Sequence, residues 1–205
     1  MESESMLEPP HVGGYESNIL LLPGSRKGEL QRHLPVMLGA MKLIREKLSD
    51  VRIKMVLPDE ELKNLAGKLF TLPEDWEIQL GNLPQALAGA DAAIASTGTV
   101  TMECAFFGVP TVTLYKTSWI NWEIAKRIAT VKWATMPNIL ANEEVFPEFI
   151  QSTATPESIS RAALELLQDE SHRAKIKSQL DKIVSSLGEP GAANRAATAI
   201  LNLFS

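Results

Sequence analysis

Short apolar runs alternate with longer amphipathic segments over residues 18–114, and no other feature of the sequence constrains the fold as much. Apolar residues recur at three- and four-residue steps from Leu30 to Leu48, which is typical of a helix with one buried face. Such an alternation, with short connections, predicts an α/β fold: a Rossmann-like parallel sheet flanked by helices, with right-handed crossovers. The predicted strands run from Ile19 to Leu22, Val51 to Leu57, Trp76 to Leu80, Asp91 to Ala95 and Pro110 to Leu114.

The pattern changes after Tyr115, where helices predominate. Met1 to Ser17 is rich in Glu and Pro, so residues 1–17 are expected to form a disordered tail or the remnant of a linker. With 205 residues, 45% of them hydrophobic, the chain can bury one full core, and residues 18–205 are expected to form a single domain with C-terminal helices. The later predicted elements are helices from Trp119 to Thr130, Pro156 to Gln168, Ser171 to Leu187 and Pro190 or Ala192 to Phe204, and a short strand from Val131 to Met136.

Two loops that follow predicted strands carry groups suited to an anion. Pro23 to Gly28 separates the first strand from the long helix and includes Gly24 and Arg26. Thr97 to Thr99 separates the fourth strand from a helix with Glu103 near its start. Glycine lets the backbone approach a ligand, helix N-termini offer unpaired N–H groups, and a guanidinium binds phosphate oxygens. Both loops should face each other at the carboxyl edge of the sheet, so we predict a phosphate site there.

Simpler interpretations of these loops remain open on the residues alone. Arg26 could be a solvated arginine, and Gly98 could belong to a capped helix in an ordinary α/β sheet. An ionised Glu103 can accept hydrogen bonds from a pair of sugar hydroxyls. Because the chain contains two such loops, a ligand site is favoured over both simpler readings.

Composition and missing motifs argue against several classes of site. A net charge of −5, without a basic run, argues against nucleic-acid binding. The three histidines, His11, His33 and His172, lack metal-ligand spacing, and neither a P-loop nor a Gly-x-Gly-x-x-Gly pattern occurs, so we expect no metal and no cofactor. Cys104 lies in an apolar helix and is expected to be an inert buried thiol. A single cysteine, no signal peptide and no apolar run of about 18 residues favour the cytoplasm.

The segment after the fifth strand has two further features. Trp119, Trp122 and Trp133, with Lys126, Arg127 and Lys132 nearby, could form an interfacial patch for peripheral membrane contact, although packing of the aromatic rings in the core is favoured. Pro137 and Asn138 are expected to begin a turn. Asn138 follows the predicted strand end and is therefore a weak ligand candidate.

Several segments, taken in chain order, resemble the C-terminal half of GT-B glycosyltransferases, and most closely that of the lipid-A-disaccharide synthases. The resemblance covers about Asn18 to Ile150, with a further match from Gly191 to Ala197. The Gly98-to-Pro110 pattern is shared with sugar-nucleotide 2-epimerases. The segments Leu22 to Arg26 and Met136 to Ala141 are more selective for the lipid-A-disaccharide synthases. The segments are Leu22-Pro23-Gly24-Ser25-Arg26, Ala95-Ser96-Thr97-Gly98-Thr99 with Glu103, Gly108-Val109-Pro110, Tyr115-Lys116, Ala125-Lys126-Arg127 and Met136-Pro137-Asn138-Ile139-Leu140-Ala141.

The resemblance implies a donor site for UDP-2,3-diacylglucosamine, whose sugar is transferred to lipid X with release of UDP at the inner face of the cytoplasmic membrane. It implies that Glu103 holds the ribose hydroxyls, that Asn82 lies near the uracil, and that Arg26 stabilises the leaving diphosphate without a metal. Thr97 stands where the family has Ser, which keeps a hydroxyl. The residues implied around the pyrophosphate are Gly24, Ser25, Arg26, Gly98 and Thr99.

The family's acceptor-binding N-terminal domain, with its general base, has no counterpart in these residues. The chain alone is therefore expected to bind nucleotide and to transfer little or no sugar, with that domain as its partner in cis or in trans. A stand-alone UDP-sugar-binding or regulatory module is one alternative, and a sugar-nucleotide 2-epimerase is another, disfavoured because its His and carboxylate catalysts are not visible. The surface that would meet the missing domain also leaves a homodimer open.

Overall fold

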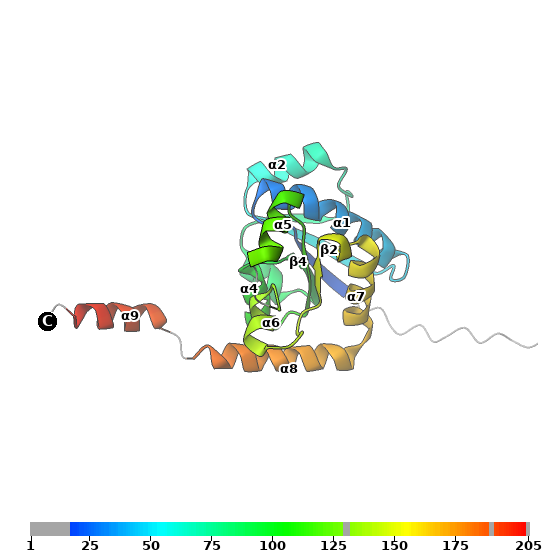
Figure 1. Ribbon diagram of the computed structural model, residues 1–205. Coiled ribbons are helices and arrows are strands. Elements are labelled where there is room, and N and C mark those ends of the chain that lie inside the picture. The colour runs from blue at the N-terminus through cyan, green and yellow to red at the C-terminus, as the bar shows by residue number, and fades with distance from the viewer. Residues whose placement is uncertain (1–16, 129–131, 189–190, 204–205) are drawn as a thin grey trace, which may run out of the picture.

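A parallel sheet of six strands, in the order β3-β2-β1-β4-β5-β6, forms the centre of the molecule (Figure 1). The structure is a computed structural model, and it describes residues 17–128, 132–188 and 191–203. The strands are β1 Ser17–Leu22, β2 Val51–Leu57, β3 Glu77–Leu80, β4 Ala92–Ser96, β5 Thr111–Tyr115 and β6 Glu148–Ile150. The helices are α1 Lys27–Arg45, α2 Glu60–Leu69, α3 Leu83–Ala88, α4 Val100–Phe106, α5 Trp119–Ile128, α6 Met136–Ala141, α7 Pro156–Gln168, α8 Glu170–Ser186 and α9 Ala192–Leu201, with a 3-10 turn at Gln151–Thr153.

Burial follows the position of each strand in the sheet. In the central strands β1 and β4, every residue from Ile19 to Leu22 and from Ala92 to Ser96 is buried, because helices cover both faces. In β2, which lies one strand farther out, Arg52 is exposed while its neighbours Val51 and Ile53 are buried. The predicted α/β class, with a parallel sheet flanked by helices, is confirmed.

Helices cover the two faces of the sheet as right-handed crossovers require. α1 and α7 pack against each other and against β4 and β5 on one face. α3 contacts β2 and α4 contacts β4 and β5, while α6 and α8 pack outside α4. Predicted helix ends are confirmed at two positions: Asp59 accepts a hydrogen bond from the Leu62 amide at 2.9 Å, and Thr155 accepts one from the Ser158 amide at 3.2 Å.

Three predictions for the C-terminal half are wrong: the strand from Val131 to Met136, of which Val131 lies outside the described residues, the turn at Pro137 and Asn138, and the packing of Trp119 in the core. Residues 132–135 form no strand, and Met136 begins α6 instead, with Pro137 in the first turn, where its missing N–H costs nothing. The sixth strand is Glu148–Ile150, which pairs with β5. Trp119 is 75% exposed rather than packed in the core.

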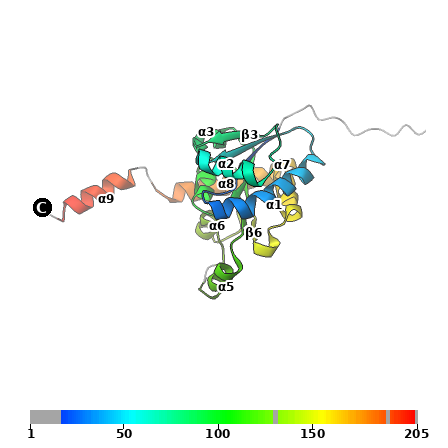
Figure 2. The same cartoon turned by 90° about the horizontal axis from the view of Figure 1, so that it is seen from above.

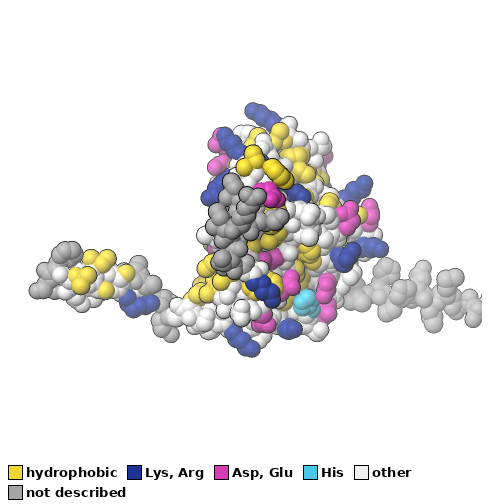
Figure 3. Space-filling model, viewed as in Figure 1, with side chains coloured by type: hydrophobic (Ala, Val, Ile, Leu, Met, Phe, Trp, Pro, Cys, Tyr) yellow, Lys and Arg dark blue, Asp and Glu magenta, His cyan; other side chains and the backbone are white. Residues whose placement is uncertain are grey.

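Of the expected tail, residues 1–16 lie outside the described part, and Ser17 already belongs to β1. α9 stands apart from the rest of the fold in both ribbon views (Figures 1 and 2), and its described side chains from Asn194 onward are exposed. Apolar side chains gather on this helix (Figure 3), with Ile200 at 55% and Leu201 at 69% exposure.

Candidate functional site

A cleft of about 540 Å³ opens at the carboxyl edge of the sheet. The strand order reverses between β1 and β4, and open α/β sheets bind ligands at such a reversal. The loops that follow β1, β2, β3 and β4 line the cleft. Among its lining residues are all but one of the predicted site residues: Gly24, Ser25, Arg26, Asn82, Thr97, Gly98, Thr99 and Glu103.

Strand register explains why residues far apart in sequence meet here. Leu22 pairs with Ala95, so β1 and β4 end at the same level and release their loops side by side. Leu57 pairs with Leu80 in the same way, which places Pro58 and the turn at Gly81 beside the first loop. The geometry on which the phosphate-site prediction depends is thus present, whereas the binding roles of the residues stay predictions.

The loop after β1 wraps around a carboxylate that the sequence analysis did not single out. Glu29, in the first turn of α1, accepts a hydrogen bond from the Ser25 amide at 3.0 Å and pairs with the Arg26 guanidinium at 3.2 Å. Gly24 has φ +118°, and a Cβ there would collide with the Glu29 side chain. Glu29 also lines the cleft. An acidic residue in the first turn of a helix is favoured by the helix dipole, so the sequence did contain a hint that Glu29 lies at this loop.

The loop after β4 leaves backbone donors at the cleft. Gly98 has φ +157°, and its carbonyl accepts from the Thr101 amide at 3.1 Å and from the Thr101 hydroxyl at 2.7 Å. Among the described residues, no protein acceptor is recorded for the Gly98 or Thr99 amides. The Glu103 side chain is exposed, and no hydrogen-bond or ion-pair partner is recorded for its carboxylate in the described part of the chain. This side of the cleft therefore offers N–H donors and one carboxylate.

The third side of the cleft is the turn between β3 and α3. Gly81 and Asn82 both have positive φ, at 59° and 46°. The Gln79 amide donates to both of their carbonyls, at 2.8 Å and 2.9 Å, and fixes the turn. The Asn82 side chain donates to Gln85 at 2.6 Å. Asn82 is thus held at the rim by local contacts.

His33 supports the first loop from behind. Its Nδ1 lies 2.9 Å from the Pro23 carbonyl, and its Nε2 accepts from the Lys116 amide at 3.0 Å. Because Nε2 is an acceptor, the ring is neutral with the proton on Nδ1. Burial lowers the pKa of His33, outweighing the opposing effect of the Pro23 carbonyl. Through this ring, the loop that carries Arg26 is tied to the chain that leaves β5.

Asn138 is the predicted site residue that the structure does not bring to the cleft. It is fully buried, and its amide donates to the Phe146 carbonyl at 2.7 Å and to Glu148 at 2.8 Å. Its side-chain oxygen accepts from the Val145 and Phe146 amides at 2.9 Å and 2.8 Å. These partners lie in the segment that leads into β6 and at the first residue of that strand, so Asn138 joins α6 to β6.

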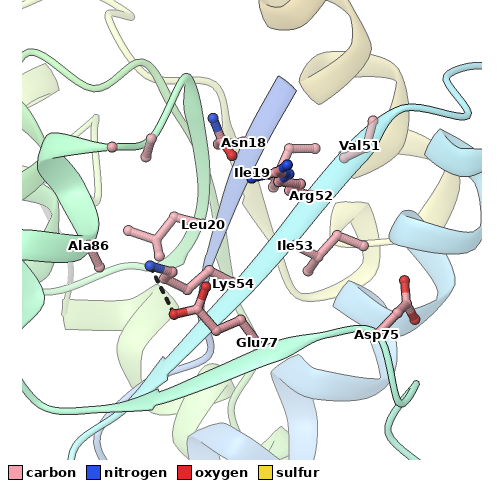
Figure 4. Close-up of a pocket in the computed structure, with 12 residues that line it drawn as sticks. Asn18, Ile19, Leu20, Val51, Arg52, Ile53, Lys54, Asp75, Glu77 and Ala86 are labelled. Atoms are coloured by element: carbon pink, nitrogen blue, oxygen red, sulfur yellow. Dashed lines mark ion pairs between the residues drawn. The ribbon is translucent and has the colours of Figure 1, made fainter. Parts of the chain in front are cut away.

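A second cavity, of about 440 Å³, lies at the amino ends of β1 and β2 (Figure 4). Two of its four charged lining residues neutralise each other, because the Lys54 ammonium lies 3.0 Å from the Glu77 carboxylate. Parallel sheets bind ligands at the opposite, carboxyl edge, where helix N-termini point inward. We therefore take the cleft with Gly24 and Gly98 as the candidate site.

Three further features of the described residues bear on the sequence predictions. They contain no group of three or more His, Cys, Asp or Glu side chains arranged to hold a metal ion. No helix among them has the length and apolar character needed to cross a bilayer. Cys104 is fully buried, and burial raises its pKa to about 12, which confirms the expected buried thiol.

Known proteins share both the sequence and the fold. A family described as lipid-A-disaccharide synthetase matches residues 3–203. The lipid-A-disaccharide synthase of Syntrophus aciditrophicus (strain SB) is 36% identical over 192 residues, which make up 92% of this chain and 50% of that protein. The chain thus spans about half the length of the curated relatives it matches.

Two solved structures illustrate the shared fold. A protein described as UDP-N-acetylglucosamine 2-epimerase from Listeria monocytogenes aligns with a TM-score of 0.59 at 19% identity, covering 93% of this chain and 45% of that chain. A spinosyn rhamnosyltransferase complexed with thymidine diphosphate aligns with a TM-score of 0.55 at 16% identity, covering 83% of this chain and 42% of that chain. At these identities the likeness shows the fold alone. This fold is the GT-B type that the sequence predicts.

Proposed function

Because the chain belongs to the lipid-A-disaccharide synthase family, we propose that its cleft is the donor site of such an enzyme. The proposed ligand is a UDP-linked 2,3-diacylglucosamine, and the proposed reaction transfers its sugar to lipid X. The observation that carries the proposal is the convergence of Arg26, the Gly98 loop and Glu103 on one cleft. The thymidine diphosphate bound to the rhamnosyltransferase of related fold adds support, because it has the same chemical class as UDP.

Each lining group has a role that follows from its chemistry. The Arg26 guanidinium and the Ser25, Gly98 and Thr99 amides would bind the diphosphate, and Gly24 would let the loop backbone approach it. Glu103 would accept hydrogen bonds from the two ribose hydroxyls. Asn82 would border the uracil, and Thr97 would contribute its hydroxyl.

Transfer breaks the bond between the sugar's anomeric carbon and the diphosphate oxygen and forms one to the acceptor hydroxyl. The diphosphate leaves with the bonding electrons, and Arg26 with the loop amides would stabilise the charge that develops on it, without a metal. The acceptor's proton must pass to a base, which we assign to the half of the relatives that this chain does not span. We therefore expect the 205 residues alone to bind UDP and to transfer little or no sugar, and we place the complete reaction at the inner membrane face.

Titration calorimetry with UDP tests the proposed site. Arg26→Ala should weaken UDP binding by roughly ten- to a hundredfold, as expected for the loss of a charged hydrogen bond. Arg161→Ala, which removes an equal charge from an exposed position on α7, is the matched control and should leave UDP affinity unchanged. Unaltered affinity in the Arg26 variant would remove it from the site.

The role of Glu103 is tested by comparing UDP with dUDP, which lacks the ribose 2′-hydroxyl. Wild-type protein should prefer UDP, whereas the Glu103→Ala variant should bind the two nucleotides with nearly equal affinity. An unchanged preference for UDP in this variant would show that the carboxylate does not contact the 2′-hydroxyl. The assignment of Glu103 to the ribose would then fall while that of Arg26 could stand.

A further inference from the structure

Glu29 occupies the donors that a bound diphosphate would use in the loop after β1. Its carboxylate accepts from the Ser25 amide at 3.0 Å and lies 3.2 Å from Arg26. The Glu29 side chain is only 18% exposed, whereas that of Arg26 is 82% exposed. The carboxylate thus lies inside the loop, with the guanidinium folded over it from the solvent side.

The charged side chains that line the cleft add to this effect on an incoming diphosphate. Its lining contains one cationic side chain, Arg26, and two carboxylates, Glu29 and Glu103. Lys27, next in sequence to Arg26, pairs instead with Glu61 on α2. A diphosphate that enters this cleft therefore meets an unfavourable carboxylate and a guanidinium that is already paired.

We propose that Glu29 is an internal counter-anion that competes with the diphosphate for Arg26 and the Ser25 amide and thereby lowers the affinity of the cleft for UDP. The inference rests on the proposed function. In a transferase that releases UDP, weaker binding of this product favours its departure after each turnover. Glu29 is thus an affinity-setting residue of the site and not only a support of the loop.

A purely structural role for Glu29 predicts the opposite result. If the carboxylate served only to hold the loop in its binding shape, removing it would disorder the loop and weaken UDP binding. If it competes with the diphosphate, removing its charge strengthens UDP binding. The sign of the change in affinity therefore separates the two roles.

The test variant is Glu29→Gln, because its amide oxygen can still accept from Ser25 while the charge is lost. We expect this variant to bind UDP about fivefold more tightly than wild type, because one partly screened negative charge is removed from the diphosphate site. The gain in affinity should be smaller for UMP and absent for uridine. Glu61→Gln is the matched control, since it removes a carboxylate near the same helix end but outside the cleft lining. Equal or weaker UDP binding by Glu29→Gln would overturn the proposal.

A measurement on wild-type protein covers the case in which the variant folds poorly. Carbon-13 NMR of the Glu29 carboxyl should show a shift on saturation with inorganic pyrophosphate, and an unmoved resonance would refute the competition. The Arg26→Ala titration separates this inference from the proposed function. If Arg26→Ala weakens UDP binding and Glu29→Gln fails to strengthen it, only the role of Glu29 falls, whereas absence of UDP binding by wild-type protein overturns the proposed function itself.

Discussion

Replacing Asn138 with alanine should destabilise the fold strongly while leaving the cleft intact. The Asn138 side chain makes four hydrogen bonds, of 2.7, 2.8, 2.9 and 2.8 Å, and all of them are internal. Val145 is 2% exposed and Phe146 is fully buried, so water cannot readily replace the lost partner of their amides. An orphaned buried group costs about 1–3 kcal/mol, so two orphaned amides and one carbonyl should lower the free energy of unfolding by roughly 4 kcal/mol.

Urea unfolding followed by circular dichroism measures this loss. With an m-value of about 2–3 kcal/mol/M, a loss of that size should lower the unfolding midpoint by roughly 1.3–2 M. Asn64→Ala, at an exposed position on α2, is the control and should change the free energy of unfolding by less than about 0.5 kcal/mol.

A second substitution probes the geometry of the same contacts. Asn138→Asp keeps an acceptor for the Val145 and Phe146 amides but places a second carboxylate against Glu148. We expect it to be less stable at pH 7 than at pH 5, because protonation of one carboxyl restores a donor between the two. The folded Asn138→Ala protein should bind UDP as wild type does. A wild-type unfolding midpoint combined with weakened UDP binding would show that Asn138 is a ligand group, and the structural reasoning would be refuted.

Two further predictions concern buried titratable groups. Burial lowers the pKa of His33 from its ordinary value of 6.5, so below about pH 6.5 the unfolded chain binds a proton that the folded chain does not. The free energy of unfolding should therefore fall as the pH decreases from 7 toward the folded-state pKa of His33. In urea unfolding, the His33→Gln variant should lose less of this free energy over the same pH range. An equal loss in wild type and variant would exclude His33 as the cause. Burial raises the pKa of Cys104 to about 12, so native protein should resist a thiol reagent at pH 8 and react fully in urea; rapid native reaction would contradict this burial.

The sequence predicted the elements whose signals are local. The apolar run from Ile19 to Leu22 and the periodic spacing from Leu30 to Leu48 specify β1 and α1 without help from the rest of the chain. Thr155 followed by Pro156 marks the start of α7 correctly, because the cap and the first-turn proline are both local devices.

The errors arose where tertiary contacts decide the structure. β6 has only three residues and exists because Thr113 of β5 offers it a pairing partner at Glu148. The segment before α6 has strand-like composition, but Glu148 accepts from the Ala134 and Thr135 amides at 2.8 Å and 2.9 Å and holds it as an irregular cap. Neither contact can be read from the separate segments, because the partners lie 13 or more residues apart.

The candidate site itself depends on one topological event. The chain leaves β3 at the edge of the sheet and returns to pair β4 with β1, on the side opposite β2. Without that return, β1 and β4 would not be neighbours, and the loops with Gly24 and Gly98 would not line one cleft. The two glycine loops in the sequence therefore indicated the chemistry of the site, and the strand order supplies the proximity that makes it one site. The same order places Glu29 inside that site, where a residue that holds the loop before α1 also contributes to the charge that an incoming diphosphate encounters.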